Sequence, residues 1–181
     1  QGEGVAELTT LLYLPLLREL GVAWERGETS VAQEHFASAF VSTRMHGLMA
    51  RARRASGERP LAAMLTPSGE KHELGLMSVG IQVALEGWAV DWLGLELPVT
   101  ELPAYCAQKQ PDVVCVSAVR DRPAAALRRL VESFREAVPA GTRVVFGGHA
   151  VARTASTVAG VEHVNDVGQL IQLLESIRRR A

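Results

Sequence analysis

The chain is poor in the features that mark secreted, membrane-bound or fibrous proteins. It has only two cysteines, too few for a disulfide framework, and Cys115 lies in an apolar run where a thiol behaves as a small hydrophobic side chain. No apolar run reaches the roughly 18 residues that a transmembrane helix needs, and no basic-then-apolar leader appears. We therefore expect a protein of the reducing cytoplasm that does not enter a membrane.

An excess of charge of either sign is also missing. Lysine and arginine number 19 against 20 aspartates and glutamates, so the formal net charge is −1. Proteins that bind nucleic acid through its phosphates carry a marked positive excess. This composition predicts that the segment makes no direct contact with nucleic acid. Because 48% of the residues are hydrophobic, the chain is rich enough in apolar side chains to form a core.

The first part of the chain has the signals of helices. Apolar residues recur at helical spacing over residues 5–56, and Pro15 within that run predicts a kink or a new helix start. A second helix is expected to begin at Ser30, whose hydroxyl forms a capping box with Gln33. The turn-forming residues 56–60 then predict a domain boundary.

After this boundary the pattern changes to short apolar strands alternating with helices. The strands are expected at residues 61–66, 88–94, 113–119, 143–148 and 160–165. Such an alternation predicts an α/β domain with a five-stranded, parallel, doubly wound sheet of Rossmann-like or flavodoxin-like type. The domains predicted are thus a helical cap, residues 1–56, and the α/β domain, residues 60–181. Ligands of this fold bind beyond the carboxyl ends of the strands.

One histidine is expected at that ligand-binding edge. The first strand runs into Glu70, His72 and Gly75. A neutral imidazole is a good ligand for a transition metal, a nearby carboxylate can hold its other nitrogen, and a glycine allows a bulky group to approach the helix. On these residues alone a solvated loop histidine remains the alternative. A single imidazole does not make a closed metal site, so it suits a cofactor that brings its own equatorial ligands.

These residues resemble a known motif. Glu70-x-His72-x-x-Gly75 is similar to the D/E-x-H-x-x-G motif of cobalamin (vitamin B12)-binding domains. Ser117 resembles the serine of the family's S-x-L/V element, and Gly147 and Gly148 resemble its GG element. The resemblance implies a base-off, His-on cobalamin, in which His72 ligates cobalt from below and the nucleotide tail is buried in the α/β domain.

The helical part carries a second resemblance. Val31, Glu34, His35 and Ser38 share one stripe of the second helix, where hydrogen bonds to other helices are one explanation for the acid and the imidazole. The spacing Trp24-x9-Glu34-His35 resembles the W-x9-EH motif of cobalamin-dependent photoreceptors of the CarH and LitR kind. There the tryptophan, a small apolar residue matched by Val31, and the Glu-His pair surround the adenosyl group of adenosylcobalamin.

The photoreceptor resemblance implies a regulatory module and not an enzyme. Light breaks the Co–C bond in that family and changes self-association, and an output domain, DNA-binding or enzymatic, is expected elsewhere in the full-length protein. Some relatives hold a bilin as second chromophore, which here would be bound non-covalently because both cysteines lie in the α/β half. The chain departs from the family in showing about two long helices instead of four. It also has Glu25 where light switches can carry a second cobalt-ligating histidine.

Three alternatives stay open at this point. A corrinoid methyl-carrier domain of a methyltransferase system shares the His72 motif, but the Trp24 to His35 spacing argues against it. A cobalamin-binding accessory domain of a mutase would need a separate substrate barrel. A light-independent cobalamin sensor would have a spectrum that illumination leaves unchanged.

Overall fold

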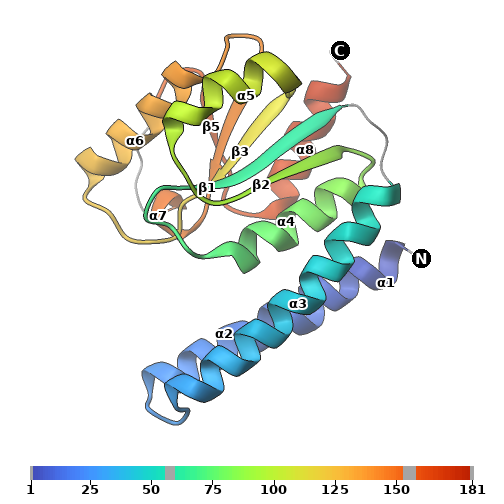
Figure 1. Cartoon of the computed structure of the whole chain (residues 1–181), viewed down its shortest axis with the longest axis vertical. Coiled ribbons are helices and arrows are strands. Elements are labelled where there is room, and N and C mark those ends of the chain that lie inside the picture. The colour runs from blue at the N-terminus through green and yellow to red at the C-terminus, as the bar shows by residue number, and fades with distance from the viewer. Residues whose placement is uncertain (1, 56–59, 153–157, 180–181) are drawn as a thin grey trace.

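Five parallel strands form one sheet in the order β2-β1-β3-β4-β5 in the computed structural model (Figure 1). The structure describes residues 2–55, 60–152 and 158–179, so most of the boundary expected at 56–60 lies outside the described residues. The strands are β1 (Leu61–Pro67), β2 (Ala89–Leu97), β3 (Val113–Ser117), β4 (Arg143–Gly147) and β5 (Val161–His163). This strand order is that of flavodoxin-like domains and confirms the predicted doubly wound α/β class.

Helices cover both faces of the sheet, as parallel strands require. On one face, α4 (Glu73–Leu85) and α8 (Val167–Arg178) pack against Met64, Cys115 and Val145. The other face carries α5 (Leu102–Lys109), α6 (Ala124–Ala137) and the short α7 (His149–Ala152), with a 3-10 turn, η2 (Val99–Glu101), before α5. Neighbouring strand residues enter opposite cores because strand side chains alternate between the two faces.

The first helical run changes its winding next to Pro15. Helix α1 (Gly2–Glu7) passes through a π-helical segment, η1 (Leu8–Tyr13), into α2 (Leu14–Glu25), which has Pro15 in its first turn. Glu7, Tyr13 and Leu14 keep helical backbone angles, so the expected disturbance at Pro15 is a change of winding within one continuous run. Helix α3 (Val31–Ala55) begins with the expected capping box: the Ser30 N–H donates to Gln33 and the Gln33 N–H donates to Ser30 Oγ, at 2.8 and 3.2 Å. Among the described residues, no helix combines the length and apolarity needed to cross a membrane.

Helices α2 and α3, here called the helical hairpin, extend well beyond the α/β layer (Figure 1). The half of α3 nearest the sheet packs on α4, and Met45 and Met49 are buried there. Gly80 leaves room for the Met49 side chain, because a Cβ atom at position 80 would lie 2.6 Å from Met49 Cε. Ser42 donates a 2.9 Å hydrogen bond to Glu73 at the start of α4. Toward Val31, the same face of α3 therefore extends beyond α4 and past the sheet.

Several boundaries differ from the sequence expectation, and two of them bear on the site. Strand β2 was expected to end at residue 94 but continues to Leu97, with register shifts opposite Leu65 and Pro67 that mark a bulge or irregularity. The sequence pattern places the start of the helix after β1 near Lys71, whereas α4 begins at Glu73, so His72 is its N-cap residue. Strands β3 and β5 are shorter than expected.

The ends of β3 and β4 generate a prediction about two neighbouring glycines. Gly148 has φ +104°, and a Cβ there would lie 2.4 Å from the Ala118 carbonyl oxygen, whereas a Cβ on Gly147 would meet Val164 Cγ2 at 3.4 Å. Gly148→Ala should lower the free energy of unfolding by about 2 kcal/mol or more, and Gly147→Ala by about 1 kcal/mol or less. Urea denaturation of the cofactor-free protein measures both. If both variants lose the same free energy of unfolding, the close approach to the Ala118 carbonyl is not specific to Gly148.

Candidate functional site

A tight turn at the end of β1 presents Glu70 and His72 at the carboxyl edge of the sheet. The Glu70 N–H donates to the Pro67 carbonyl at 3.0 Å, and Gly69 takes φ +78° inside this turn. A positive φ at that position is what a type II turn requires and what glycine adopts without steric cost. The turn places Glu70 at the carboxyl edge of the sheet and His72 at the N-cap of α4.

The Glu70 carboxylate is fully buried and is surrounded by hydrogen-bond donors. Its Oε2 accepts from the backbone N–H groups of Val119 and Arg120 at 2.8 and 2.7 Å. Its Oε1 accepts from the His72 N–H at 3.2 Å and contacts His72 Nδ1. An ionised carboxylate accepts only, so this contact assigns the proton of the neutral ring to Nδ1 and leaves the Nε2 lone pair available. The His72 side chain is 63% exposed, so it is accessible to a ligand.

Hydrogen bonding keeps Glu70 ionised despite its burial. Burial alone would raise the pKa of this carboxyl group, but the bonds from the Arg120 N–H, the His72 side chain and the Val119 N–H together hold it below its ordinary value. The site therefore keeps a negative charge directly behind the imidazole, and such a charge increases the basicity of a ligating histidine.

A slot of about 390 Å³ opens between α4, the ends of β3 and β4, the start of α8 and one side of α2. Gly75, Ser117, Gly147 and Gly148, all predicted from the sequence, lie together in its wall. Further lining residues are Val79, Cys115, Val145 and Leu170 on the apolar side, and Arg18, Asn165 and Asp166 on the polar side. Burial raises the pKa of the Cys115 thiol to about 12, so this thiol is uncharged at neutral pH.

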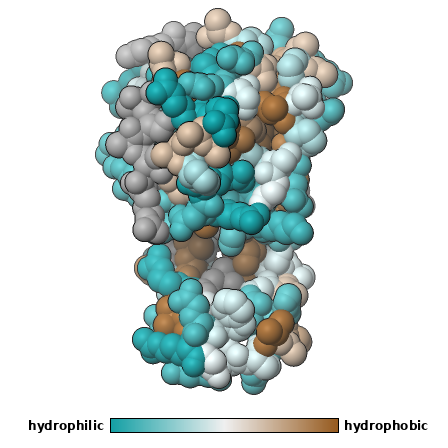
Figure 2. All heavy atoms as spheres, turned by 90° about the vertical axis from the view of Figure 1, so that its left-hand side faces the viewer, coloured by the Kyte–Doolittle hydropathy of each residue, from teal (hydrophilic) through white to brown (hydrophobic). Residues whose placement is uncertain are grey.

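The other predicted residues lie on the helical hairpin and apart from the slot. Trp24 and Val31 are 50% and 58% exposed at the hairpin turn. Glu34 Oε1 accepts a 2.6 Å hydrogen bond from Ser38, and Glu34 Oε2 lies 4.0 Å from His35 Nε2. Figure 2 shows a hollow between the α/β body and the projecting hairpin. The structure thus separates the predicted residues into a lower group around His72 and an upper group on the hairpin.

Three participants were missed by sequence reasoning. Val119 and Arg120 act through backbone N–H groups, which no side-chain pattern reveals, although their position directly after the Ser117 element was a usable signal. Arg18 lines the slot from α2. Its contribution depends on how the hairpin packs against the α/β layer, and a motif within one domain does not report that packing.

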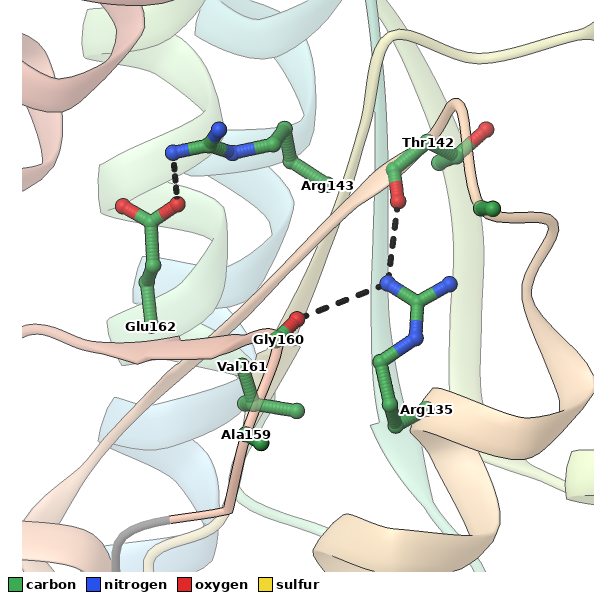
Figure 3. A pocket seen from close by; sticks show the side chains of 8 residues that line it. Arg135, Thr142, Arg143, Ala159, Gly160, Val161 and Glu162 are labelled. Atoms are coloured by element: carbon green, nitrogen blue, oxygen red, sulfur yellow. Dashed lines mark hydrogen bonds and ion pairs between the residues drawn. The ribbon is translucent and has the colours of Figure 1, made fainter.

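A larger hollow, of about 650 Å³, lies at the opposite, amino-terminal edge of the sheet (Figure 3). Its two arginines are already engaged within the protein. Arg135 donates to the carbonyl groups of Thr142 and Gly160, and Arg143 pairs with Glu162. Arg135 also donates to the carbonyls that follow α6, at residues 138 and 139. This hollow is a structural junction between α6, β4 and β5.

The lowered pKa of Glu70 generates a prediction for the cofactor-free protein. A carboxyl group with a depressed folded-state pKa contributes stability above its unfolded value of about 4.3, and that contribution is lost as the pH falls through the folded-state pKa. Glu70→Gln should therefore be less stable than wild type at about pH 7, with the difference shrinking toward about pH 3. Urea denaturation across this range measures it, and Glu132→Gln, on the exposed Arg128 ion pair, is the control. A difference that does not change with pH would contradict the prediction.

Comparison with known proteins gives a consistent result over nearly the whole chain. Residues 60–180 match the model of a family described as "B12 binding domain", and residues 3–48 match a second model with the same description. The chain is 34% identical over 168 residues to the HTH-type transcriptional repressor CarA of Myxococcus xanthus, covering 91% of this chain and 56% of that protein. It is 33% identical over 144 residues to the repressor CarH of the same organism, covering 80% and 47%. The chain therefore spans about half the length of these curated relatives.

Solved structures agree on the fold. The monomethylamine corrinoid protein of Methanosarcina barkeri superimposes with a TM-score of 0.73 at 15% identity, over 96% of this chain and 84% of that one. A cobalamin-binding protein from Desulfitobacterium hafniense DCB-2 gives a TM-score of 0.53 at 16% identity, over 97% and 84%. At these identities the likeness concerns the fold alone. From the match of residues 60–180 and the identity to CarA, the chain belongs to the family of B12-binding domains.

Proposed function

We propose that this B12-binding domain is a light-sensing regulatory module that binds adenosylcobalamin base-off, with His72 as the lower axial ligand of cobalt. The observation that carries the proposal is the Glu70–His72 pair. The buried carboxylate contacts Nδ1 and leaves the Nε2 lone pair on an exposed ring, at the N-cap of the helix whose Gly75 lines the slot. One imidazole fits a metal that arrives with its equatorial ligands already in place.

The slot suits the nucleotide tail of such a cofactor. Its lining is largely apolar and includes three glycines, which allow a ring system to approach the backbone. Ser117 would offer a hydroxyl to the tail, and the Gly147–Gly148 segment would contact it through main-chain atoms. His72 would hold cobalt from below, while Glu70 fixes the ring orientation. The bound cofactor supplies a Co–C bond that visible light can break.

The upper group on the hairpin supports the adenosyl form. An aromatic ring at Trp24 offers a stacking surface to a nucleobase, and Glu34 offers carboxylate oxygens to ribose hydroxyls. Ser38 already orients Glu34 through its 2.6 Å bond. Val31, which is exposed, would leave space for the adenosyl group where a larger side chain would not. A bilin in the hairpin would be non-covalent, because Cys106 and Cys115 are buried in the α/β domain.

A regulatory role, and not an enzymatic one, is supported by the relatives named as repressors. We infer a DNA-binding or enzymatic output domain in the full-length protein and self-association that changes with light. The buried, unpaired cysteines support action in the reducing cytoplasm. A corrinoid methyl carrier is the second candidate, since the monomethylamine corrinoid protein shares the fold. A light-independent cobalamin sensor is the third.

Replacing the proposed ligand tests the cobalt site directly. In His72→Ala, cobalt should lose its protein nitrogen and take water instead, because no other described imidazole contacts Glu70. Electron paramagnetic resonance of the cobalt(II) form, with ¹⁴N- and ¹⁵N-histidine-labelled protein, reports an axial histidine nitrogen through its splitting. Wild type should show splitting that changes with the isotope, and His72→Ala should not. The exposed variant His46→Ala is the control, and histidine splitting retained in His72→Ala would refute the assignment.

Illumination tests the light response and the role of position 25. Glu25 offers a carboxylate where an imidazole could ligate cobalt, and carboxylate is the poorer partner for such a metal. We expect the illuminated adenosylcobalamin complex to change its visible spectrum to a form with water, or His35 after a helix shift, as upper ligand. Size-exclusion chromatography should show a modest change in oligomeric state.

Three outcomes separate the candidates. A spectrum unchanged by light points to the light-independent sensor, and methyl transfer from a partner enzyme points to the carrier. A bis-imidazole spectrum that survives His35→Ala would overturn the expectation for Glu25.

A further inference from the structure

Thr66 is a fully buried polar residue at the end of β1 that the site described above leaves unexplained. Its hydroxyl makes two hydrogen bonds. It donates to the backbone carbonyl of Glu70 at 2.7 Å and accepts from the backbone N–H of Glu96 at 3.0 Å. A hydroxyl has one donor hydrogen and two acceptor lone pairs, so it can join these two main-chain groups at once.

The second partner comes from the irregular end of β2. There the pairing steps from Leu65↔Gly94 to Pro67↔Leu97, and Gly94 has φ +85°. Glu96 has φ +53°, a conformation that costs free energy for a residue other than glycine. Irregular strand ends of this kind occur next to functional sites, where they redirect a group. In this protein the redirected group is the Glu96 N–H, which points to Thr66.

Glu70 is therefore held at both of its ends. Its carboxylate is fixed by the Val119 and Arg120 N–H groups, and its carbonyl is fixed by Thr66. Only one residue, Lys71, lies between Glu70 and His72. If the carbonyl were free, the peptide following Glu70 could rotate and carry His72 away from the carboxylate.

We propose that Thr66 is a positioning residue for His72, acting through the Glu70 main chain and braced by the irregular end of β2. The proposal rests on the proposed function, in which His72 ligates cobalt. Thr66 does not line the slot, and its hydroxyl bonds to the main chain of Glu70 and Glu96 and not to the histidine. Its effect is on the fraction of molecules in which the imidazole is oriented toward the metal. Removal of a group that orients a ligating histidine weakens metal affinity by about ten- to a hundredfold.

The test compares two buried threonines that differ in place. Thr66→Val keeps the shape of the side chain and removes the hydroxyl, leaving a buried acceptor and a buried donor without partners. Thr142→Val is the matched control, because Thr142 is also buried and its hydroxyl donates to the Pro111 carbonyl at 2.8 Å, near the amino-terminal edge of the sheet. Thr66→Ser restores the hydroxyl. Glu96→Gly keeps the N–H and removes only the side chain.

We expect both valine variants to unfold at lower urea concentration than wild type. Only Thr66→Val should also bind hydroxocobalamin about tenfold more weakly and lose part of the histidine-nitrogen splitting in the cobalt(II) form. Thr66→Ser and Glu96→Gly should retain wild-type affinity and splitting. If Thr66→Val fails to fold, Thr66→Ala is measured in its place with the same expectation.

Two results have distinct meanings. If the folded Thr66 variant shows full histidine splitting and binds hydroxocobalamin as tightly as Thr142→Val does, the positioning role is overturned. His72 would still be the ligand in that case. Absence of histidine splitting in wild type itself would refute the proposed cobalt ligation, and with it the premise of the Thr66 proposal.

Discussion

The buried carboxylate of Glu70 is the interaction on which the arrangement of the site depends. A charge in the interior is costly unless it is fully hydrogen-bonded, and here the donors come from the loop after β3 and from the start of α4. Meeting that requirement ties two neighbouring strand ends and one helix start together. The imidazole of His72 is then held by the same group that joins these elements.

Sheet order makes this arrangement possible. Because β1 pairs with β3, and β3 pairs with β4, the loops that follow these strands emerge side by side. The ligand loop, the donors at residues 119 and 120 and the glycine pair consequently share one edge. The hairpin reaches this edge through α2, whose Arg18 lines the slot, and it is placed by the packing of α3 on α4. The packing within the α/β domain thus places the lower group of residues around His72. The packing of α3 on α4 places the upper group on the hairpin.

The sequence was sufficient for the features that depend on local pattern. Strand and helix alternation predicted the doubly wound sheet, Pro15 predicted an irregularity near the start of α2, and Ser30 with Gln33 predicted the cap of α3. The sequence also predicted that Gly75, Ser117, Gly147 and Gly148 would share a crevice, and they line one slot. Features built from main-chain groups could not be found this way. The donors to Glu70 and the irregular end of β2 depend on backbone geometry, which residue identity at those positions does not specify.

Helix α3 has a mechanical consequence because it is a single unbroken helix of 25 residues. Ser42 is bonded to Glu73, so it acts as a fulcrum between an inner arm seated on α4 and an outer arm that ends at Val31. At 1.5 Å per residue the outer arm is about 17 Å long, and a tilt of about 10° at the fulcrum displaces its end by about 3 Å. A small tilt of α3 at the residue bonded to the neighbour of His72 would therefore be enlarged about 11 residues away, at the end of the outer arm.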